Sequence, residues 1–316
     1  MTVLALSTFG EPSARLADNT ALRFPTEKSL ELLLLAAVAP GQELTRSEAA
    51  FALRSEHSEG LGRKALSTDL WRLRSVFDNA GLPSTDILET SGRSIALRQD
   101  APIFVDALFL EQVWADLRNT APGEISELDA GRMRRAIALY HGDFAKSLDQ
   151  EWCFLYREKL RSKHMALMTL LMDHEAAKDN WQAGLRWADR LLELDPLLEH
   201  AHRTAMKCHF LMGNRASAIR QFSACRDILE QELSVPPSDE TERMYRGLIH
   251  VTVDDPARPV KDRVTQSLSL SPAPVPKGQV RSERPITDQL SMALGSLDAA
   301  RSLVANVDRR LRQPSS

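Results

Sequence analysis

The amino-acid sequence predicts a mainly α-helical chain that begins with a small α+β domain. Three observations support this fold class. Short segments with β-type patterns stand near the start and again around residue 90. From about Val105 to Leu248, nearly every stretch has the apolar spacing of a helix. Within that helical region, a pattern of small and apolar residues recurs after 34 residues. The 316 residues are enough for two domains.

The first 25 residues predict three short strands, VLALSTFG, SARLAD and ALRF, the last of which follows an Asp18-Asn19 turn. The pattern then becomes helical over residues 26–38, TEKSLELLLLAAV, with Thr26 placed as the N-cap. A proline and a glycine follow directly, and both residue types end helices.

Three more elements complete the predicted α+β domain. Residues 45–53 begin with a threonine and place a glutamate three residues later, which is the spacing of a capping box. A polar loop, RSEHSEGLG, precedes a longer helix over about residues 63–79. Residues 87–98, ILETSGRSIALR, predict two short strands around a tight turn. Strands, three helices and a closing hairpin together predict a winged helix-turn-helix domain over residues 1–98.

Residues 103–250 predict an all-α domain of helical repeats. The segment that starts at Asp179 aligns with the segment that starts at Gly213, 34 residues later. Gly184 and Ala218 are the small residues at one aligned position. Thirty-four residues is the tetratricopeptide (TPR) period, in which small residues stand where paired helices cross closely. A helical bundle without repeats is the alternative interpretation.

Two further segments follow the helical region. Residues 254–285 contain six prolines with serines and scattered charges, which predicts a disordered linker. In residues 286–312, apolar residues alternate in steps of four and three from Ile286 to Leu311, which is the a/d spacing of a coiled coil. The pattern fits an amphipathic helix that joins two copies of the chain. It fits equally a helix that docks on the repeat domain.

Composition and motifs argue against several protein classes. No run of about 18 apolar residues exists and the start has no basic region of a signal peptide, so we expect a cytoplasmic protein with no membrane partner. Cys153, Cys208 and Cys225 form no CxxC pair, which favours buried thiols over a metal site or a disulfide. GxSxG, HExxH and Walker motifs are absent from the sequence. We therefore expect no catalytic residues, no cofactor and no enzyme activity.

Several motifs, in order, carry a resemblance to a known family. They are the early strand LALSTFG, the helix LELLLLAA, the segment LWRLR, the run LYHGDF, and the segments EWCFLYREKLR, LDPLLEHAHR and GNRASAIRQFSACRDILEQEL. Residues 1–250 thereby resemble the bacterial transcriptional activator family of the Streptomyces antibiotic regulatory protein type. Members join an OmpR-type winged helix to a TPR-like bacterial transcriptional activator domain. The resemblance implies double-stranded DNA and RNA polymerase as partners.

By this resemblance the helix over residues 63–79 is the recognition helix, which lies in the major groove. One face carries an apolar stripe of Leu66, Leu70, Leu73 and Phe77. The opposite face carries Lys64, Thr68, Trp71, Arg72 and Ser75. These side chains mix donors, acceptors and an apolar ring, as base-reading surfaces do. The alternatives are a solvated polar face and, for Trp71, packing on another helix of the domain.

Three further arginines are candidates for contacts that position the protein on DNA. Arg63 and Arg74 flank the recognition face and suit phosphates. Arg93 stands at the hairpin turn, where it would enter the minor groove or meet a phosphate. The family often has a Gly-Tyr pair at this turn, whereas this chain has Gly92-Arg93.

The predicted function is sequence-specific DNA binding with activation of transcription through RNA polymerase. A protein-interaction scaffold with a degenerate winged helix is the alternative, since repeat arrays form docking surfaces. The charge of residues 1–100, with 11 basic and 13 acidic side chains, favours the scaffold. A local cluster of Arg63, Lys64, Arg72 and Arg74, opposed there chiefly by Asp69, favours DNA.

Overall fold

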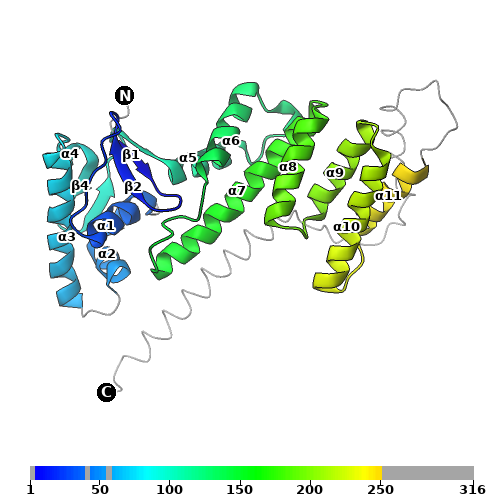
Figure 1. The fold of residues 1–316 in the computed structure, drawn as a ribbon. Helices are drawn as coiled ribbons and strands as arrows, with labels where there is room; N and C mark the ends of the chain where they lie inside the picture. Colours follow the sequence, from blue (N-terminus) through cyan, green and yellow to red (C-terminus); the bar gives the residue numbers. More distant parts are fainter. Residues whose placement is uncertain (1–3, 40–42, 55–58, 251–316) are drawn as a thin grey trace, which may run out of the picture. The chain divides into compact units, whose positions relative to one another are not determined.

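The structure, a computed structural model, describes residues 4–39, 43–54 and 59–250 (Figure 1). In this part of the chain, two small three-stranded sheets and their helices precede a long series of packed helices. The predicted fold class, mainly helical with an α+β start, is confirmed. The predicted linker and tail helix, residues 254–285 and 286–312, lie outside the described residues.

The first sheet has the strand order β2-β1-β6. Strands β1 (Leu4–Ser7) and β2 (Ser13–Leu16) are antiparallel, with Leu4 opposite Leu16. Leu4 and Leu6 are fully buried and alternate with half-buried neighbours, as the period of a strand requires.

The predicted third strand, ALRF at residues 21–24, is wrong. Only an isolated bridge joins Ala21 to Arg15, and no strand forms there. The other edge of β1 is taken by β6 (Ile103–Val105), which pairs with it in parallel from about a hundred residues away. Because this partner is so distant in sequence, local patterns could not identify it.

Three helices follow the first hairpin. Helix α1 (Glu27–Val38) begins after Thr26 as predicted, but the Thr26 side chain does not cap it and instead contacts the Ser29 hydroxyl at 2.7 Å. Helix α2 (Arg46–Leu53) has the predicted capping box, in which the Glu48 N–H donates to the Thr45 hydroxyl at 3.2 Å.

Helix α3 (Glu59–Asn79) starts one turn earlier than predicted. The expected loop contained Gly60 and Gly62, which disfavour a helix in isolation. In the structure Gly62 is buried, and a side chain there would meet Ala50 of α2 at 3.5 Å. Packing against α2 thus stabilises a turn that local propensity disfavours.

The second sheet has the order β3-β5-β4 and closes the winged helix. Strands β4 (Leu88–Thr90) and β5 (Ser94–Leu97) form the predicted hairpin. Strand β3 (Glu43–Thr45), which the sequence did not predict, pairs with the free edge of β5. A short helix, α4 (Ser84–Ile87), leads into β4.

The remaining helices form the region predicted as repeats. They are α5 (Asp106–Leu117), α6 (Glu127–Leu139), α7 (Glu151–Ala177), α8 (Trp181–Leu194), α9 (Glu199–Leu211), α10 (Arg215–Leu233) and α11 (Asp239–His250), with a 3-10 turn at Pro122–Glu124. Helices α7 to α10 each pack on the next (Figure 1). The TPR-like arrangement is therefore confirmed.

The 34-residue period is visible in the backbone. Asp179 and Gly213 both adopt a left-handed conformation, with φ of 59° and 82°, at the ends of α7 and α9. Helices α8 and α10 begin two residues after these turns. Gly184 is buried where a Cβ atom would lie 3.3 Å from the Cys208 sulfur, and Ala218 is fully buried. Small residues thus stand in the buried helix crossings, as the period predicts.

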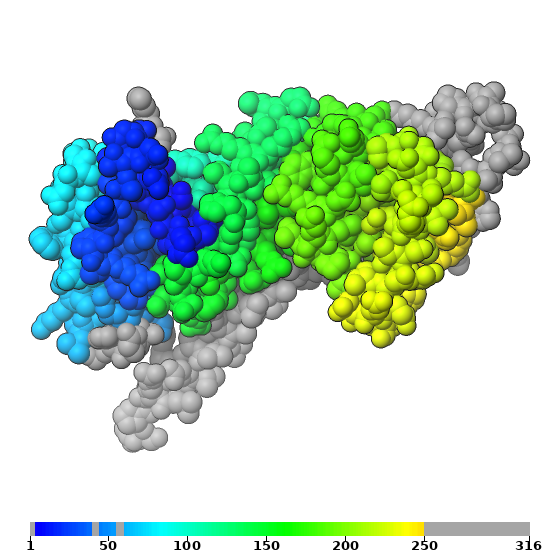
Figure 2. All heavy atoms as spheres, in the orientation of Figure 1, coloured from blue at the N-terminus to red at the C-terminus, as the bar shows by residue number. Residues whose placement is uncertain are grey.

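The first sheet and the helices also share hydrogen bonds. The buried Asp106 carboxylate, at the start of α5, accepts from the Thr8 N–H at 2.9 Å and from the Thr8 hydroxyl at 2.5 Å. A bridge joins Phe9 to Phe144. In Figure 2 the blue atoms of the first strands touch green atoms of the helical region. The limits of the two domains, 1–98 and 103–250, stay a prediction.

Candidate DNA-binding surface

The buried face of α3 is as predicted. Leu66, Leu70, Leu73 and Phe77 are all buried and belong to the main hydrophobic core. The stripe holds α3 against α1 and α2 and thereby fixes which side chains face outward. Asp69 is also buried, with 1% of its side chain exposed. Asp69 opposes Arg72 as the sequence indicated, but it does so from a buried position that the helical pattern alone did not show.

The opposite face of α3 is open to solvent. Lys64 and Thr68 are exposed, Ser75 is half-buried, and Trp71 is 68% exposed. The alternative in which Trp71 packs on another helix of the domain is therefore wrong. The hydroxyls of Thr68 and Ser75 donate to backbone carbonyls one turn earlier, at 3.4 and 3.0 Å. Their lone pairs remain able to accept from an external donor.

Arg72 is held in place by the buried Asp69. Its guanidinium lies 3.5 Å from one Asp69 oxygen, while Arg54 of the α2 end lies 2.6 Å from the other. Because Arg54 already compensates Asp69, Arg72 has donors left for a ligand. Its side chain is 37% exposed, so the pair orients Arg72 without burying it. A planar guanidinium presented in this way suits a guanine edge.

The two flanking arginines contact neighbouring elements. Arg63 donates to the Ser47 hydroxyl of α2 at 3.1 Å, and Arg74 donates to the Thr90 hydroxyl of β4. These contacts tie α3 to both of its neighbours. They place the two guanidiniums at the rims of the exposed face, where phosphate contacts are expected.

The wing tip is shaped by serine hydrogen bonds. The Ser91 hydroxyl accepts from the backbone N–H groups of Arg93 and Ser94, at 3.1 and 2.9 Å. Arg93 is exposed at the turn. The turn therefore has a defined shape and presents one cation, although the family's aromatic residue is absent.

Arg46 is a further candidate, and the sequence analysis missed it. Its guanidinium donates to Ser67 of α3 at 3.0 Å, and its backbone N–H donates to the Arg93 carbonyl at 2.9 Å. Arg46 therefore lies between α3 and the wing. In the sequence it is only the first residue after a helix cap, and no local signal places it near residues 67 or 93.

The structure thus places Arg63, Lys64, Thr68, Trp71, Arg72, Arg74 and Ser75 on one helix, with Arg46 and Arg93 linked at its side. In the described residues, no group of three or more His, Cys, Asp or Glu side chains could hold a metal ion. No helix of the same part of the chain is long and apolar enough to cross a membrane. Cys153, Cys208 and Cys225 are buried and unpaired, and burial raises their pKa values to about 12, 11 and 12.

Comparison with known proteins identifies the helical region. Residues 105–249 match the family described as "Bacterial transcriptional activator domain". The match contains α5 to α10 and all of α11 except its last residue. Over these residues the chain is similar to a bacterial transcriptional activator domain. The family resemblance inferred from the sequence motifs is confirmed.

One similar sequence and one similar structure extend beyond this domain. The regulatory protein AfsR of Streptomyces coelicolor is 22% identical over 294 residues, which cover 90% of this chain and 28% of AfsR. The chain thus spans under a third of that relative. Mycobacterium tuberculosis EmbR, solved in complex with a low-affinity phosphopeptide, superposes with a TM-score of 0.67 at 16% identity. That match covers 84% of this chain and 69% of EmbR, and it shows a shared fold.

Proposed function

We propose that this protein is a sequence-specific DNA-binding transcription regulator, and that it activates transcription by contacting RNA polymerase. The observation that carries the first half is the exposed face of α3. Trp71 is 68% exposed beside Lys64 and Thr68, and Arg72 is held in an outward position. On a helix face that only meets water, an exposed indole ring gains no favourable contact. On a helix that enters the major groove, the ring can make apolar contacts with base edges.

The arrangement around α3 favours DNA over the protein-scaffold alternative. Arg46, Arg63, Arg74 and Arg93 come from α2, α3 and the wing, and hydrogen bonds link them to their neighbours. Cations spread along one helix and its wing fit a phosphate backbone on both sides of the major groove. Activation through RNA polymerase is proposed from the bacterial transcriptional activator domain at residues 105–249.

A salt series tests DNA binding directly. Binding to a duplex selected from a random library should weaken as salt rises, with a slope in log K of about −0.9 for each phosphate contact. Arg93→Ala should reduce the magnitude of the slope by about 0.9, the value of one phosphate contact. Arg220 is an exposed arginine of α10, and Arg220→Ala should leave the slope unchanged. Failure to select any duplex, together with capture of a protein partner, would support the scaffold instead.

We also propose that the chain works in the cytoplasm, where its DNA and polymerase lie, and that it forms a homodimer. Many DNA sites consist of two half-sites, and one protein binds both only when two DNA-binding domains are joined as a dimer. The apolar spacing in the sequence of residues 286–311 would supply the joining helix. Truncation after residue 255 should then convert a dimer into a monomer, as measured by light scattering, and weaken DNA binding. A truncated protein that is still a dimer would show that this segment does not join the two copies.

A further inference from the structure

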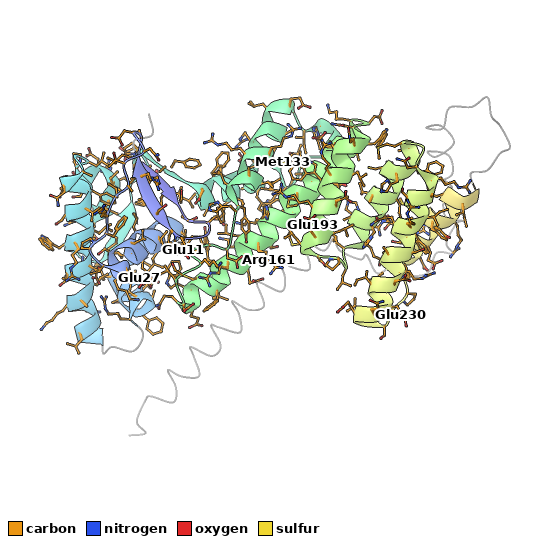
Figure 3. All side chains as sticks on the ribbon, in the orientation of Figure 1. Glu11, Glu27, Met133, Arg161, Glu193 and Glu230 are labelled. Carbon is orange, nitrogen blue, oxygen red and sulfur yellow. The ribbon has the colours of Figure 1, made fainter. Side chains whose placement is uncertain are left out.

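A cavity of about 420 Å³ lies in the helical domain, away from the α3 surface. Its walls come from α7, α8 and the segment 140–143 that follows α6. Figure 3 labels Arg161 on α7 and Glu193 on α8, the two facing helices that bound it. The volume is in the range of small-molecule sites.

One wall of the cavity is a pair of stacked rings. Tyr140 lies against His164 with ring centroids 4.2 Å apart and planes within 11°. His164 is 6% exposed, and its Nε2 atom has no hydrogen-bond partner among the described residues. Burial, with a smaller effect of Arg190, lowers the pKa of His164 to about 4, so the ring is neutral at pH 7. The cavity therefore has one aromatic wall of two stacked rings, on which a planar group of a ligand can pack.

The cavity also presents two guanidiniums, those of Arg161 and Arg190. In the part of the chain that the structure describes, neither forms an ion pair with a carboxylate. Arg190 instead lies 5.7 Å from the centroid of the Trp187 ring. Uncompensated arginines in a concave site suit carboxylate or phosphate groups, which accept from the guanidinium fork.

The remaining walls limit what the ligand can be. Asp143 and Glu193 also line the cavity and would repel a ligand that carries more than one acidic group. Met165 and Leu194 supply apolar surface. The lining therefore fits a small organic anion with one acidic group and a planar apolar part.

The same wall is bonded to the winged helix. The Gly10 N–H donates to the Asp143 carbonyl at 2.9 Å, and the Ala145 N–H donates to the Thr8 carbonyl at 2.7 Å. The Phe9 ring lies 4.6 Å from Tyr140. A Cβ atom on Gly142 would lie 3.3 Å from the Gly10 Cα, so the two segments touch closely. These contacts join the cavity wall directly to the end of β1.

We propose that this cavity binds a small organic anion, a carboxylate or phosphate monoester with a planar apolar group, and that occupancy acts on the winged helix through the segment Tyr140–Ala145. Binding is independent of the function proposed above. Only its regulatory meaning rests on the proposed DNA-binding function. A ligand that stiffens the contact with β1 would restrict the motion of the winged helix relative to the helical domain.

Titration calorimetry of the full chain tests the site. Phenyl phosphate and benzoate supply the two head groups on a planar ring, and inorganic phosphate tests the head group alone. Phenyl phosphate or benzoate should bind one per chain and more tightly than inorganic phosphate. Arg161→Gln with Arg190→Gln should weaken binding about tenfold or more. Arg186→Gln, an exposed arginine of α8 outside the cavity, should bind as the wild type does. No saturable binding, or equal loss in the Arg186 variant, would overturn the proposal.

Hydrogen exchange, measured without DNA, tests the coupling. With phenyl phosphate or benzoate bound, peptides covering residues 139–148 and 4–11 should both exchange more slowly, because their amides bond to each other. Binding with no change in residues 4–11 would keep the site and overturn its link to the winged helix. Because neither measurement uses DNA, failure here is distinct from failure of the DNA-binding proposal.

Discussion

Tryptophans on two parts of this molecule have opposite surroundings. On α8, Trp181 and Trp187 are half-buried, and each lies 5.7 Å from a cation, Lys207 and Arg190 respectively. On α3, Trp71 is 68% exposed, and no cation–π contact to it occurs among the described residues. These two rings of the helical domain contact cations within the chain, whereas the Trp71 ring stays open to solvent. On the DNA-binding function proposed above, Trp181 and Trp187 contribute to stability and Trp71 contributes to binding.

The largest effect is expected on the exposed face of α3. Replacing Thr68 and Arg72 together by Ala should lower discrimination between operator and scrambled DNA by about 2–4 kcal/mol, since each good base contact contributes about 1–3 kcal/mol. Stability should change by about 0.5 kcal/mol or less, because Arg54 still pairs with Asp69 at 2.6 Å. Competition binding and thermal unfolding measure the two quantities.

The matched control for this pair lies on α10. Ser217 and Arg220 are joined by a hydrogen bond of 2.9 Å on the surface. Replacing both by Ala should leave DNA discrimination unchanged. If the α3 double variant keeps its operator preference, the recognition-helix assignment is wrong.

Truncating one tryptophan from each region tests the comparison itself. Trp187→Ala should reduce the free energy of unfolding by about 2 kcal/mol or more, because a half-buried indole loses part of the 3–5 kcal/mol of a core aromatic. Trp71→Ala should change stability by about 0.5 kcal/mol or less while weakening DNA binding. Chemical denaturation and a DNA titration give both values. A large loss of stability in Trp71→Ala would remove the distinction between the two regions.

Small residues at helix crossings should matter only for stability. Leu in place of Gly184 or Ala218 should overpack a buried crossing and cost about 1–3 kcal/mol of the free energy of unfolding. Ala216→Leu is the control, because Ala216 is exposed on α10. Urea denaturation measures the stability of the three variants. If the Gly184 and Ala218 variants are as stable as the wild type, the TPR-like packing is contradicted.

Burial in the helical domain should also make stability depend on pH. The folded pKa of His164 is about 4, against 6.5 for an ordinary histidine. Between these values the unfolded chain binds more protons, so stability present above pH 6.5 is lost as pH falls towards 4. The free energy of unfolding is expected to fall by about 1–3 kcal/mol, since each pKa unit corresponds to about 1.36 kcal/mol. His164→Phe, which keeps a ring against Tyr140, should flatten this profile, and an unchanged slope would argue against a buried neutral ring.

The smallest effect concerns two helix starts within the winged helix. Thr45→Ala should cost about 1 kcal/mol, because it removes the observed capping box of α2. Thr26→Ala should cost less, because the Thr26 side chain does not cap α1. Thermal unfolding compares the two, and equal losses would mean that the Thr26–Ser29 contact stabilises α1 as well as a cap would.

Much of the candidate surface was predictable because it lies on one helix. Helical periodicity alone separated Leu66, Leu70, Leu73 and Phe77 from the exposed residues of α3. Arg46 was not predictable, because its role depends on contacts with Ser67 and with the backbone of Arg93. The burial of Asp69 was not predictable either, because its main partner, Arg54, lies at the end of the preceding helix.

The sequence by itself determined what depends on near neighbours: the helices and their buried stripes, the capping box at Thr45, the hairpin around Gly92 and the 34-residue period. Tertiary structure decided what depends on distant partners. It joined β6 to β1, extended α3 through Gly62 against Ala50, and brought the segment after α6 onto β1 to form the wall of a cavity. The physical reason is that strand pairing and burial join groups far apart in the chain. Helix periodicity and capping are decided within a few residues.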